Sequence, residues 1–168
     1  MNDSQPTLTY GVTASPFGPC LLACREKTLV YLGFLSSDES PEPLLAEARI
    51  TGKLERDDIA MEAIADKVFS GNLTHFEAAG TPFQQQVWAE LRRIPAGETR
   101  TYAQIAQAIG QPQAVRAVGT AIGRNPLAYL IPCHRVVRTD GSLGGFRWGL
   151  AIKRRLLDAE AQSFACAV

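Results

Sequence analysis

Apolar and polar positions follow different patterns in the two halves of the chain. In the first half, short runs rich in β-branched and aromatic residues are separated by turn residues, which predicts three strands, at residues 7–14, 20–24 and 28–35. Apolar residues then recur at helical spacing, and we expect two helices, at residues 43–49 and 58–69. The first half therefore predicts a small α/β unit with an antiparallel three-stranded sheet.

The second half of the chain has helical periodicity throughout. Thr81 followed by Pro82 is typical of a helix start, because threonine caps the N-terminus and proline suits the first helical position. We expect four helices: from 82 to a stop signal at 94–97, then 102–109 with Thr101 as its cap, 112–122 and 148–161. The predicted class is α+β. An N-terminal domain covers residues 1–80, including a connector at 70–80, and a mostly helical domain covers residues 81–168.

The composition is that of a folded protein with a hydrophobic core, since 46% of the residues are apolar and 20% are charged. No apolar run approaches the roughly 20 residues that a membrane span requires. Met1-Asn2-Asp3-Ser4 lacks the basic segment and the apolar stretch of a signal peptide. We therefore expect a cytoplasmic protein with no membrane partner.

The chain has four cysteines, which we expect to be free thiols: Cys20, Cys24, Cys133 and Cys166. Cys20 and Cys24 together with the distant His75 form a weak zinc pattern. The simpler interpretation is that both cysteines are small apolar residues of one strand. We therefore expect no metal site.

The net charge of zero conceals an asymmetry between the two halves. Residues 1–80 carry 6 basic and 12 acidic side chains, whereas residues 81–168 carry 11 basic and 5 acidic ones. A basic half beside an acidic half favours contact between the basic half and an anionic polymer such as a nucleic acid.

Two short helices around Gly110-Gln111-Pro112 have the form of a helix-turn-helix. On the second helix, three apolar residues at i, i+3 and i+7 are expected to face the core: Val115, Val118 and Ile122. A neighbouring stripe holds small residues: Ala114, Ala117 and Ala121, with Gly119 beside them. Such a surface permits close approach, and Arg116 would project from it into a nucleic-acid groove, with contacts to backbone and shape rather than to base edges. An ordinary helical hairpin, with its alanines packed on another helix, fits the pattern equally well.

The segment Ile131-Pro132-Cys133-His134-Arg135 carries the strongest chemical signal. Basic neighbours lower the pKa of a thiol and make the nucleophilic thiolate available, so Cys133 is a candidate nucleophile. Pro132 restricts the backbone before it, and Asn125 is placed to brace the turn through side-chain hydrogen bonds. Glu160 shares the inward apolar stripe of the last predicted helix, which suggests a Cys133–His134–Glu160 arrangement of nucleophile, base and orienting group. The alternative is a buried cysteine beside a surface histidine.

These residues resemble one family closely, the O6-alkylguanine–DNA alkyltransferases, also called methylated-DNA–protein-cysteine methyltransferases. The resemblance covers residues 81–160, and the first 80 residues resemble the family's variable N-terminal domain only loosely. Its most specific part is IPCHRVV at 131–137, preceded by Asn125-Pro126 and by RAVG at 116–119. The remaining matches are FQQQVWAELRRI at 83–94, Pro95-Ala96-Gly97, Tyr102 with Ile105-Ala106, and Lys153 with Leu156-Leu157.

The resemblance implies DNA repair by direct reversal, the activity of a methylated-DNA–[protein]-cysteine S-methyltransferase. A methyl or small alkyl group would move from O6 of guanine, or from O4 of thymine, to Cys133, irreversibly and once per chain. His134 would deprotonate Cys133 through a water, and Glu160 would orient His134. Asn125 and Pro132 would support the turn. The chemistry requires no metal and no organic cofactor.

The family resemblance also implies a mode of DNA binding. A monomer would place its helix-turn-helix in the minor groove of double-stranded DNA, and the damaged nucleotide would flip into a pocket. Arg116 would fill the gap in the base stack, and Tyr102 would help to turn the nucleotide out. The residues implied for DNA contact are Arg116, Tyr102, Ala114, Ala117, Gly119 and Thr101. Those implied for the base pocket are Val136, Phe146, Arg147, Trp148 and Ile122, with backbone carbonyls near Cys133 and Val136 reading the guanine amino group.

The loop at 144–149 departs from the wider family pattern, Gly-Tyr-x-Gly-Gly. Phe146 stands at the tyrosine position and Trp148 at a glycine position, a form similar to the C-terminal half of adaptive-response (Ada) proteins. At Arg147 the backbone N–H, rather than the side chain, is the expected donor to O6. Trp148 would narrow the pocket and favour methyl over bulky adducts. The Ada-type zinc domain is absent, so phosphotriester repair and transcriptional switching are not expected.

Two other classes of function compete with the alkyl acceptor. A non-enzymatic damage binder, like the alkyltransferase-like proteins, would typically carry Trp at the position of Cys133. A turnover hydrolase with a Cys–His–Glu centre would act repeatedly on an ester or amide and would have no affinity for DNA.

Overall fold

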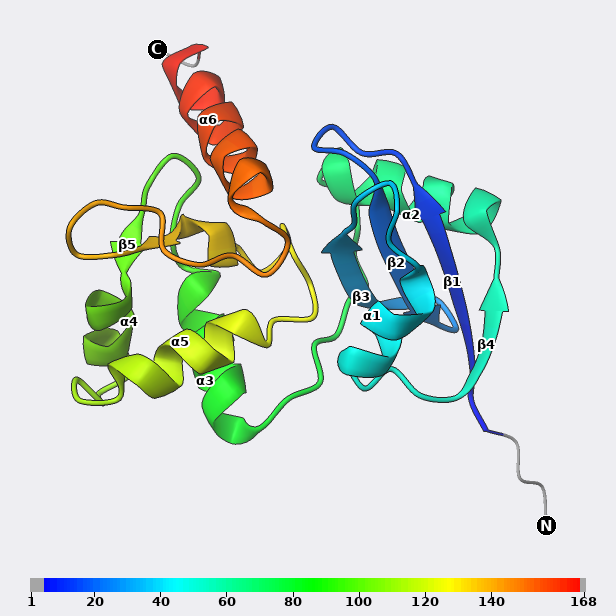
Figure 1. Ribbon diagram of the computed structural model, residues 1–168, viewed down its shortest axis with the longest axis horizontal. Helices are drawn as coiled ribbons and strands as arrows, with labels where there is room; N and C mark the ends of the chain where they lie inside the picture. Colours follow the sequence, from blue (N-terminus) through cyan, green and yellow to red (C-terminus); the bar gives the residue numbers. More distant parts are fainter. Residues whose placement is uncertain (1–4, 167–168) are drawn as a thin grey trace. The chain divides into compact units, whose positions relative to one another are not determined.

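The computed structural model describes residues 5–166, and the chain divides into two compact units between Ala79 and Gly80 (Figure 1). The segment Met1–Ser4, which we used to argue against a signal peptide, lies outside the described residues. Within the part of the chain that is described, no helix is both long and apolar enough to cross a membrane.

The first unit is built on one sheet whose strands lie in the order β3-β2-β1-β4. The three predicted antiparallel strands are confirmed as β1 (Thr7–Thr13), β2 (Cys20–Arg25) and β3 (Thr28–Phe34). The count of three was incomplete, because β4 (Lys53–Arg56) pairs in parallel with β1 at the sheet edge. All residues of β4 are exposed, so this strand has no alternation of apolar and polar residues that a sequence pattern could reveal.

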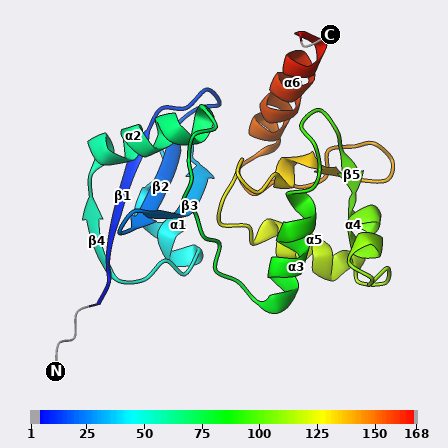
Figure 2. The ribbon, with the colours of Figure 1, turned by 180° about the vertical axis from the view of Figure 1, so that it is seen from behind.

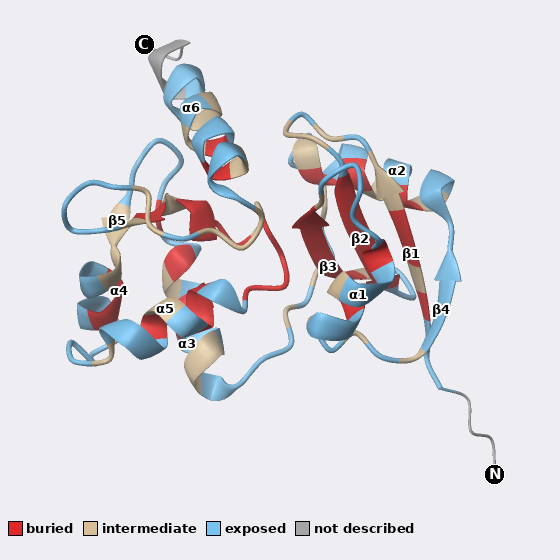
Figure 3. Cartoon of the chain, in the orientation of Figure 1, coloured by how far each residue is buried: buried red, intermediate tan, exposed pale blue. Residues whose placement is uncertain are grey.

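Two helices cover this sheet: α1 (Pro41–Glu47) and α2 (Asp58–Phe69), the second packed along β1 (Figure 2). Five consecutive residues of β2 are buried, and because successive side chains point to opposite faces, both faces of the sheet are covered (Figure 3). Leu21 and Ala23 pack with Leu45 of α1. Cys20 and Cys24 are buried free thiols, and burial raises their pKa values to about 12 and about 11.

The second unit is mostly helical. Its elements are α3 (Pro82–Leu91), β5 (Arg100–Thr101), α4 (Tyr102–Ala108), α5 (Val115–Gly123), the short 3-10 turn η1 (Cys133–Arg135), β6 (Val136–Val137) and α6 (Leu150–Cys166). The two predicted helix caps are confirmed, because Thr81 forms a capping box with Gln84 and Thr101 forms one with Gln104. The predicted start of a helix at Pro112 is wrong: after Gly110, which has a φ of +75°, residues 111–114 form a turn and α5 begins at Val115.

The buried stripe of α5 also differs from the predicted one. Val118 and Ile122 are buried as expected, but Val115 is 37% exposed and Ala121, expected on the outer stripe, is only 2% exposed. The reason is that α3 packs against the later turns of α5, where the indole Nε1 of Trp88 donates a buried hydrogen bond of 2.9 Å to the carbonyl of Ala121. Val115 lies in the first turn, away from this contact.

We expect Trp88→Phe to lower the free energy of unfolding by about 1–3 kcal/mol, because it removes a buried hydrogen bond and leaves unfilled volume between α3 and α5. Urea denaturation at neutral pH measures the loss. Gln86→Ala, an exposed change on the same helix, is the matched control and should stay within about 0.5 kcal/mol of the parent chain. Equal effects of the two substitutions would contradict this account of the helix packing.

Candidate active site

The turn that carries Cys133 is closed by a buried asparagine. Asn125 is fully buried; its Nδ2 donates to the carbonyl of Ile131 at 2.9 Å, and its Oδ1 accepts from the N–H of Leu127 at 2.9 Å. These are the side-chain hydrogen bonds expected from the sequence. Since Leu127 and Ile131 are both bonded to the amide of Asn125, the chain enters Pro132 and Cys133 along a defined path.

Cys133 and His134 begin the short turn η1, and both are buried, with 3% and 0% exposure. The alternative of a surface histidine is therefore excluded. Backbone bonds shape the turn: the N–H of Arg135 donates to the carbonyl of Pro132 at 3.0 Å, and the N–H of Val136 donates to that of Cys133.

A carboxylate from α6 meets this turn. Nε2 of His134 lies 2.7 Å from Oε1 of Glu160, so the predicted pairing of these two side chains is present. Hydrogen bonds lower the pKa of Glu160, so the group is an acceptor and Nε2 of His134 carries the proton. Nδ1 of His134 then presents its lone pair, and this buried nitrogen has no hydrogen-bond partner among the described residues.

Arg135 takes a place that the sequence did not suggest. We expected its charge to act on Cys133, but its guanidinium binds Glu160, with Nε donating to both carboxylate oxygens at 3.1 Å and Nη2 to Oε1 at 2.7 Å. Burial by itself raises the pKa of Glu160, but the hydrogen bonds and charges of His134 and Arg135 outweigh it and lower this pKa to about 2. Glu160 is therefore ionised at every pH at which the protein would work.

The expectation of a lowered thiol pKa at Cys133 is wrong. Burial raises the pKa of Cys133 to about 11, although a hydrogen bond from Asn125 and the charge of Lys153 act in the opposite direction. The nearby positive charge in the sequence is that of Arg135, and its guanidinium forms an ion pair with Glu160 instead of acting mainly on Cys133. The thiol is therefore protonated at neutral pH and requires a base before it can attack.

Lys153 is the other residue at the site whose place the sequence did not reveal. It is fully buried, and its Nζ donates to the carbonyls of Val136 at 2.6 Å, Gly145 at 3.2 Å and Leu143. Burial lowers the pKa of Lys153 to about 8, whereas the charge of Cys133 opposes this shift. A signal was present: Lys153 is seven residues before Glu160, on the same inward stripe of α6.

Tyr102 is brought to the site by the strand pair β5 and β6, in which Thr101 lies opposite Val137. Its ring lies between two glycines: a Cβ on Gly119 of α5 would stand 3.8 Å from it, and one on Gly144 would stand 3.0 Å from its hydroxyl. Burial, and then the charge of Cys133, raises the pKa of Tyr102. Gly119 thus leaves room for the ring of Tyr102, which belongs to the same unit. Thr101, implied for DNA contact, uses its hydroxyl to cap α4.

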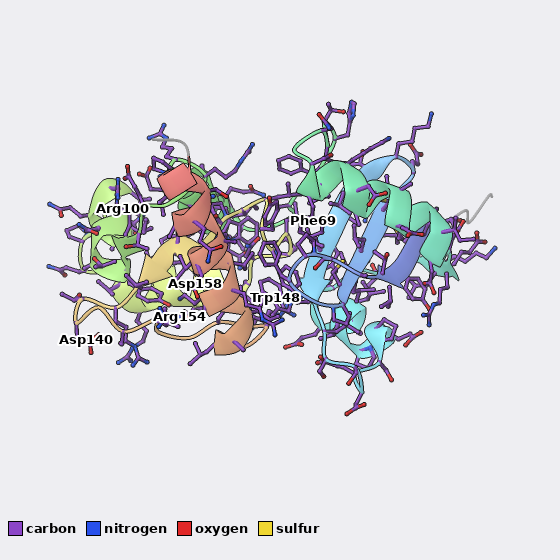
Figure 4. The ribbon with its side chains drawn as sticks, turned by 90° about the horizontal axis from the view of Figure 1, so that it is seen from above. Phe69, Arg100, Asp140, Trp148, Arg154 and Asp158 are labelled. Carbon is purple, nitrogen blue, oxygen red and sulfur yellow. The ribbon has the colours of Figure 1, made fainter. Side chains whose placement is uncertain are left out.

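The remaining candidates occupy two regions. Arg116 and Ala117 are exposed on α5, and Ala114 is partly exposed just before it. In the loop before α6 (Figure 4), the rings of Phe146 and Trp148 meet edge to face with centroids 5.3 Å apart. Further contacts in this region join Cζ of Arg147 to the Trp148 ring at 5.9 Å and Nζ of Lys153 to the Phe146 ring at 6.0 Å. Two other pocket candidates, Ile122 and Val136, are buried.

A buried thiol beside a histidine–carboxylate pair, in a unit that also contains a helix-turn-helix, defines the class of protein: one that combines a cysteine nucleophile with a helix pair suited to nucleic acid. Comparison with known families specifies it further. The domain described as "6-O-methylguanine DNA methyltransferase, DNA binding domain" matches residues 82–162, and the one described as "6-O-methylguanine DNA methyltransferase, ribonuclease-like domain" matches residues 8–89.

Individual relatives agree with the family match. The methylated-DNA–protein-cysteine methyltransferase of Methanosarcina barkeri is 45% identical over 158 residues, covering 90% of this chain and 96% of the relative. The Escherichia coli protein named bifunctional transcriptional activator/DNA repair enzyme Ada is 40% identical over 169 residues, which cover 92% of this chain and 46% of that protein. The crystal structure of Mycobacterium tuberculosis OGT in complex with DNA has a TM-score of 0.72 at 37% identity, covering 92% and 93% of the two chains. The chain belongs to the 6-O-methylguanine DNA methyltransferase family, as its motifs predicted.

The lowered pKa of Glu160 makes stability depend on pH. Because folding lowers this pKa from 4.5 to about 2, the resulting stabilisation is complete above the unfolded value and is lost as the pH falls from about 5 towards 2. At neutral pH it amounts to at most about 3 kcal/mol. We expect the difference in unfolding free energy between the parent chain and Glu160→Gln to shrink over this range, as measured by urea denaturation at pH 7, 5 and 3.

Asp158→Asn is the control, since Asp158 is exposed on the same helix (Figure 4). Its effect should be small at all three pH values. A difference between the parent chain and Glu160→Gln that stays constant from pH 7 to pH 3 would show that the ionised carboxylate does not stabilise the fold.

Proposed function

We propose that this chain repairs DNA by moving a methyl group from O6 of guanine to the sulfur of Cys133, once per protein molecule. The observation that carries the proposal is that the buried Cys133 and His134 meet the half-buried Glu160. The carboxylate fixes the proton on Nε2 of His134 and leaves its Nδ1 as a base. Family membership supplies the substrate class, because the relatives are named for methylated DNA and a protein cysteine.

The proposed reaction is a nucleophilic substitution at the methyl carbon. The thiol proton of Cys133 passes to Nδ1 of His134, through a water, and the sulfur forms a bond to the methyl carbon as the bond from that carbon to O6 breaks. The electron pair stays on the guanine, which takes up the proton and becomes the normal base. A thioether does not hydrolyse under these conditions. Cys133 therefore keeps the methyl group, and each protein molecule reacts once.

Burial suits this chemistry. The raised pKa of Cys133 keeps the thiol protonated until the substrate is present, and the charge of Lys153 favours the thiolate once it forms. Lys153 also holds the carbonyls of Val136 and Gly145, which fixes the strand and loop around the base pocket. A carbonyl oxygen has two lone pairs, so that of Val136 retains one for the guanine amino group.

The DNA partner is proposed from the helix pair α4 and α5. Arg116 and Ala117 are exposed on α5, and Gln113 lies in the exposed turn before it, so Arg116 stands among small or polar side chains on this face. Such a surface suits the minor groove, where contact with backbone and shape replaces reading of base edges. The family member from Mycobacterium tuberculosis has been crystallised in complex with DNA, which supports a DNA partner for this chain. Monomeric action, activity on O4-methylthymine and a cytoplasmic location stay predictions.

Intact-protein mass spectrometry after incubation with a duplex that carries one O6-methylguanine tests the proposal. We expect the mass of a single methyl group, saturating at one per chain and mapped to Cys133 by peptide digestion. Cys133→Ser should gain no mass but should retain binding to the same duplex, because its DNA-binding face is unchanged.

The other outcomes are equally informative. Tight binding by the parent chain without added mass would favour a damage binder. Repeated cleavage of an ester or amide without affinity for DNA would favour a hydrolase. A methyl group on Cys20 or Cys24 would refute the assignment of the acceptor.

Arg116→Ala should slow methyl transfer from duplex DNA about tenfold, a loss of roughly 1.4 kcal/mol, because the variant lacks the side chain that fills the gap left by the flipped nucleotide. Transfer from the free base O6-methylguanine requires no flipping and should be unchanged. Single-turnover rates with the two substrates measure this split. Arg124→Ala, an exposed change at the end of the same helix, is the control. Equal losses on duplex and free base would argue against the role in flipping.

A further inference from the structure

The carboxylate of Glu160 is shared between two cationic or potentially cationic partners. His134 uses one hydrogen bond of 2.7 Å, whereas Arg135 uses three, through Nε and Nη2. Arg135 is itself fixed, because its Nη1 donates to the carbonyl of Ile94 just beyond α3. The side chains of Arg135 and Glu160 are 15% and 13% exposed, so solvent screens this ion pair only weakly.

We infer that Arg135 is a positioning residue for methyl transfer: by neutralising Glu160, it keeps His134 in the neutral form that can accept the proton of Cys133. This inference rests on the function proposed above. It gives Arg135 an electrostatic role in the reaction beyond holding the turn together.

The effect of Arg135 on His134 is one of charge. A carboxylate 2.7 Å from an imidazole favours the doubly protonated imidazolium, and an imidazolium cannot act as a base. With Arg135 in contact with the same carboxylate, the group of three has no net charge when His134 is neutral and one positive charge when it is protonated. Without Arg135, the full negative charge of Glu160 acts on His134, and the imidazolium is favoured before the substrate arrives.

The other titratable groups around His134 do not reverse this result. On η1, Cys133 is protonated at neutral pH because burial raises its pKa to about 11. From α6, Lys153 carries a positive charge that also disfavours a second cation. Tyr129, in the preceding segment, has a pKa raised by burial and by Glu160, so it is neutral. From the α3 side, the carbonyl of Ile94 reaches the cluster through Arg135.

The proton balance fits the proposed reaction. Before transfer, the thiol holds the proton and His134 is neutral. During transfer, the proton passes to Nδ1 of His134, and Glu160 stabilises the transient imidazolium. The proton then passes to the guanine that leaves. Because of Arg135, the carboxylate of Glu160 orients His134 without favouring its protonation before the thiol proton arrives.

The test is the pH dependence of the single-turnover rate of methyl transfer from the free base O6-methylguanine, which separates the chemistry from DNA binding. For Arg135→Met, we expect the midpoint of the acid limb to rise by about one pH unit, which is about a tenfold loss below the midpoint, with recovery at high pH. Arg135→Lys keeps the charge and should keep the midpoint close to that of the parent chain. Arg154→Met, an exposed change on α6 (Figure 4), is the control.

A loss of rate that is equal at all pH values, with an unmoved midpoint, would reduce Arg135 to a structural role and overturn the inference. A midpoint that moves down would also overturn it. If Arg135→Met does not fold, Arg135→Gln tests the same loss of charge while keeping hydrogen-bond donors.

A measurement on the parent chain makes the test independent of folding in the variants. The ¹⁵N chemical shifts of the His134 ring should show the neutral form, protonated on Nε2, at pH 7, and an imidazolium there would refute the inference. A parent chain that transfers no methyl group would instead refute the proposed function, so the two failures are distinguishable.

Discussion

The contact between Glu160 and the turn at Cys133–Arg135 is the interaction on which the second unit depends. It ties the last helix to the segment that carries the thiol, and it fixes both the orientation and the proton position of His134. Because Glu160 is anchored by four hydrogen bonds, the cost of burying its charge is offset, and its pKa falls to about 2. The same contact couples the fold to the proposed chemistry, since the carboxylate that ties α6 to the turn also orients His134, the base of the proposed reaction.

Burial has opposite consequences for the groups at this site. It raises the pKa of Cys133 and lowers that of Lys153, so both side chains are pushed towards their neutral forms. Each opposes the shift of the other, since a thiolate favours an ammonium and an ammonium favours a thiolate. A protonated thiol reacts slowly with other electrophiles and can still attack once a base acts, which suits the single use proposed above.

Features that depend on local sequence were predicted well. The capping threonines Thr81 and Thr101 start their helices where expected, since a cap is a contact between residues only three positions apart. The predictions that failed depend on which elements pack against each other in the tertiary structure. Val115 is exposed and Ala121 is buried because α3 meets the later turns of α5, and β4 is paired only because β1 offers an edge.

The sequence by itself determined the family, and it predicted the pairing of His134 with Glu160 beside Cys133 that the structure contains. A motif of adjacent residues and a helical stripe place these groups without knowledge of the whole fold. Only the tertiary structure decided the state of those groups. In the structure, Arg135 pairs with Glu160, and the buried Lys153 donates to the carbonyls of Val136 and Gly145. Burial raises the pKa of Cys133, which the sequence suggested would fall. The physical reason is that protonation depends on burial and on partners distant in sequence, whereas residue identity and local spacing do not.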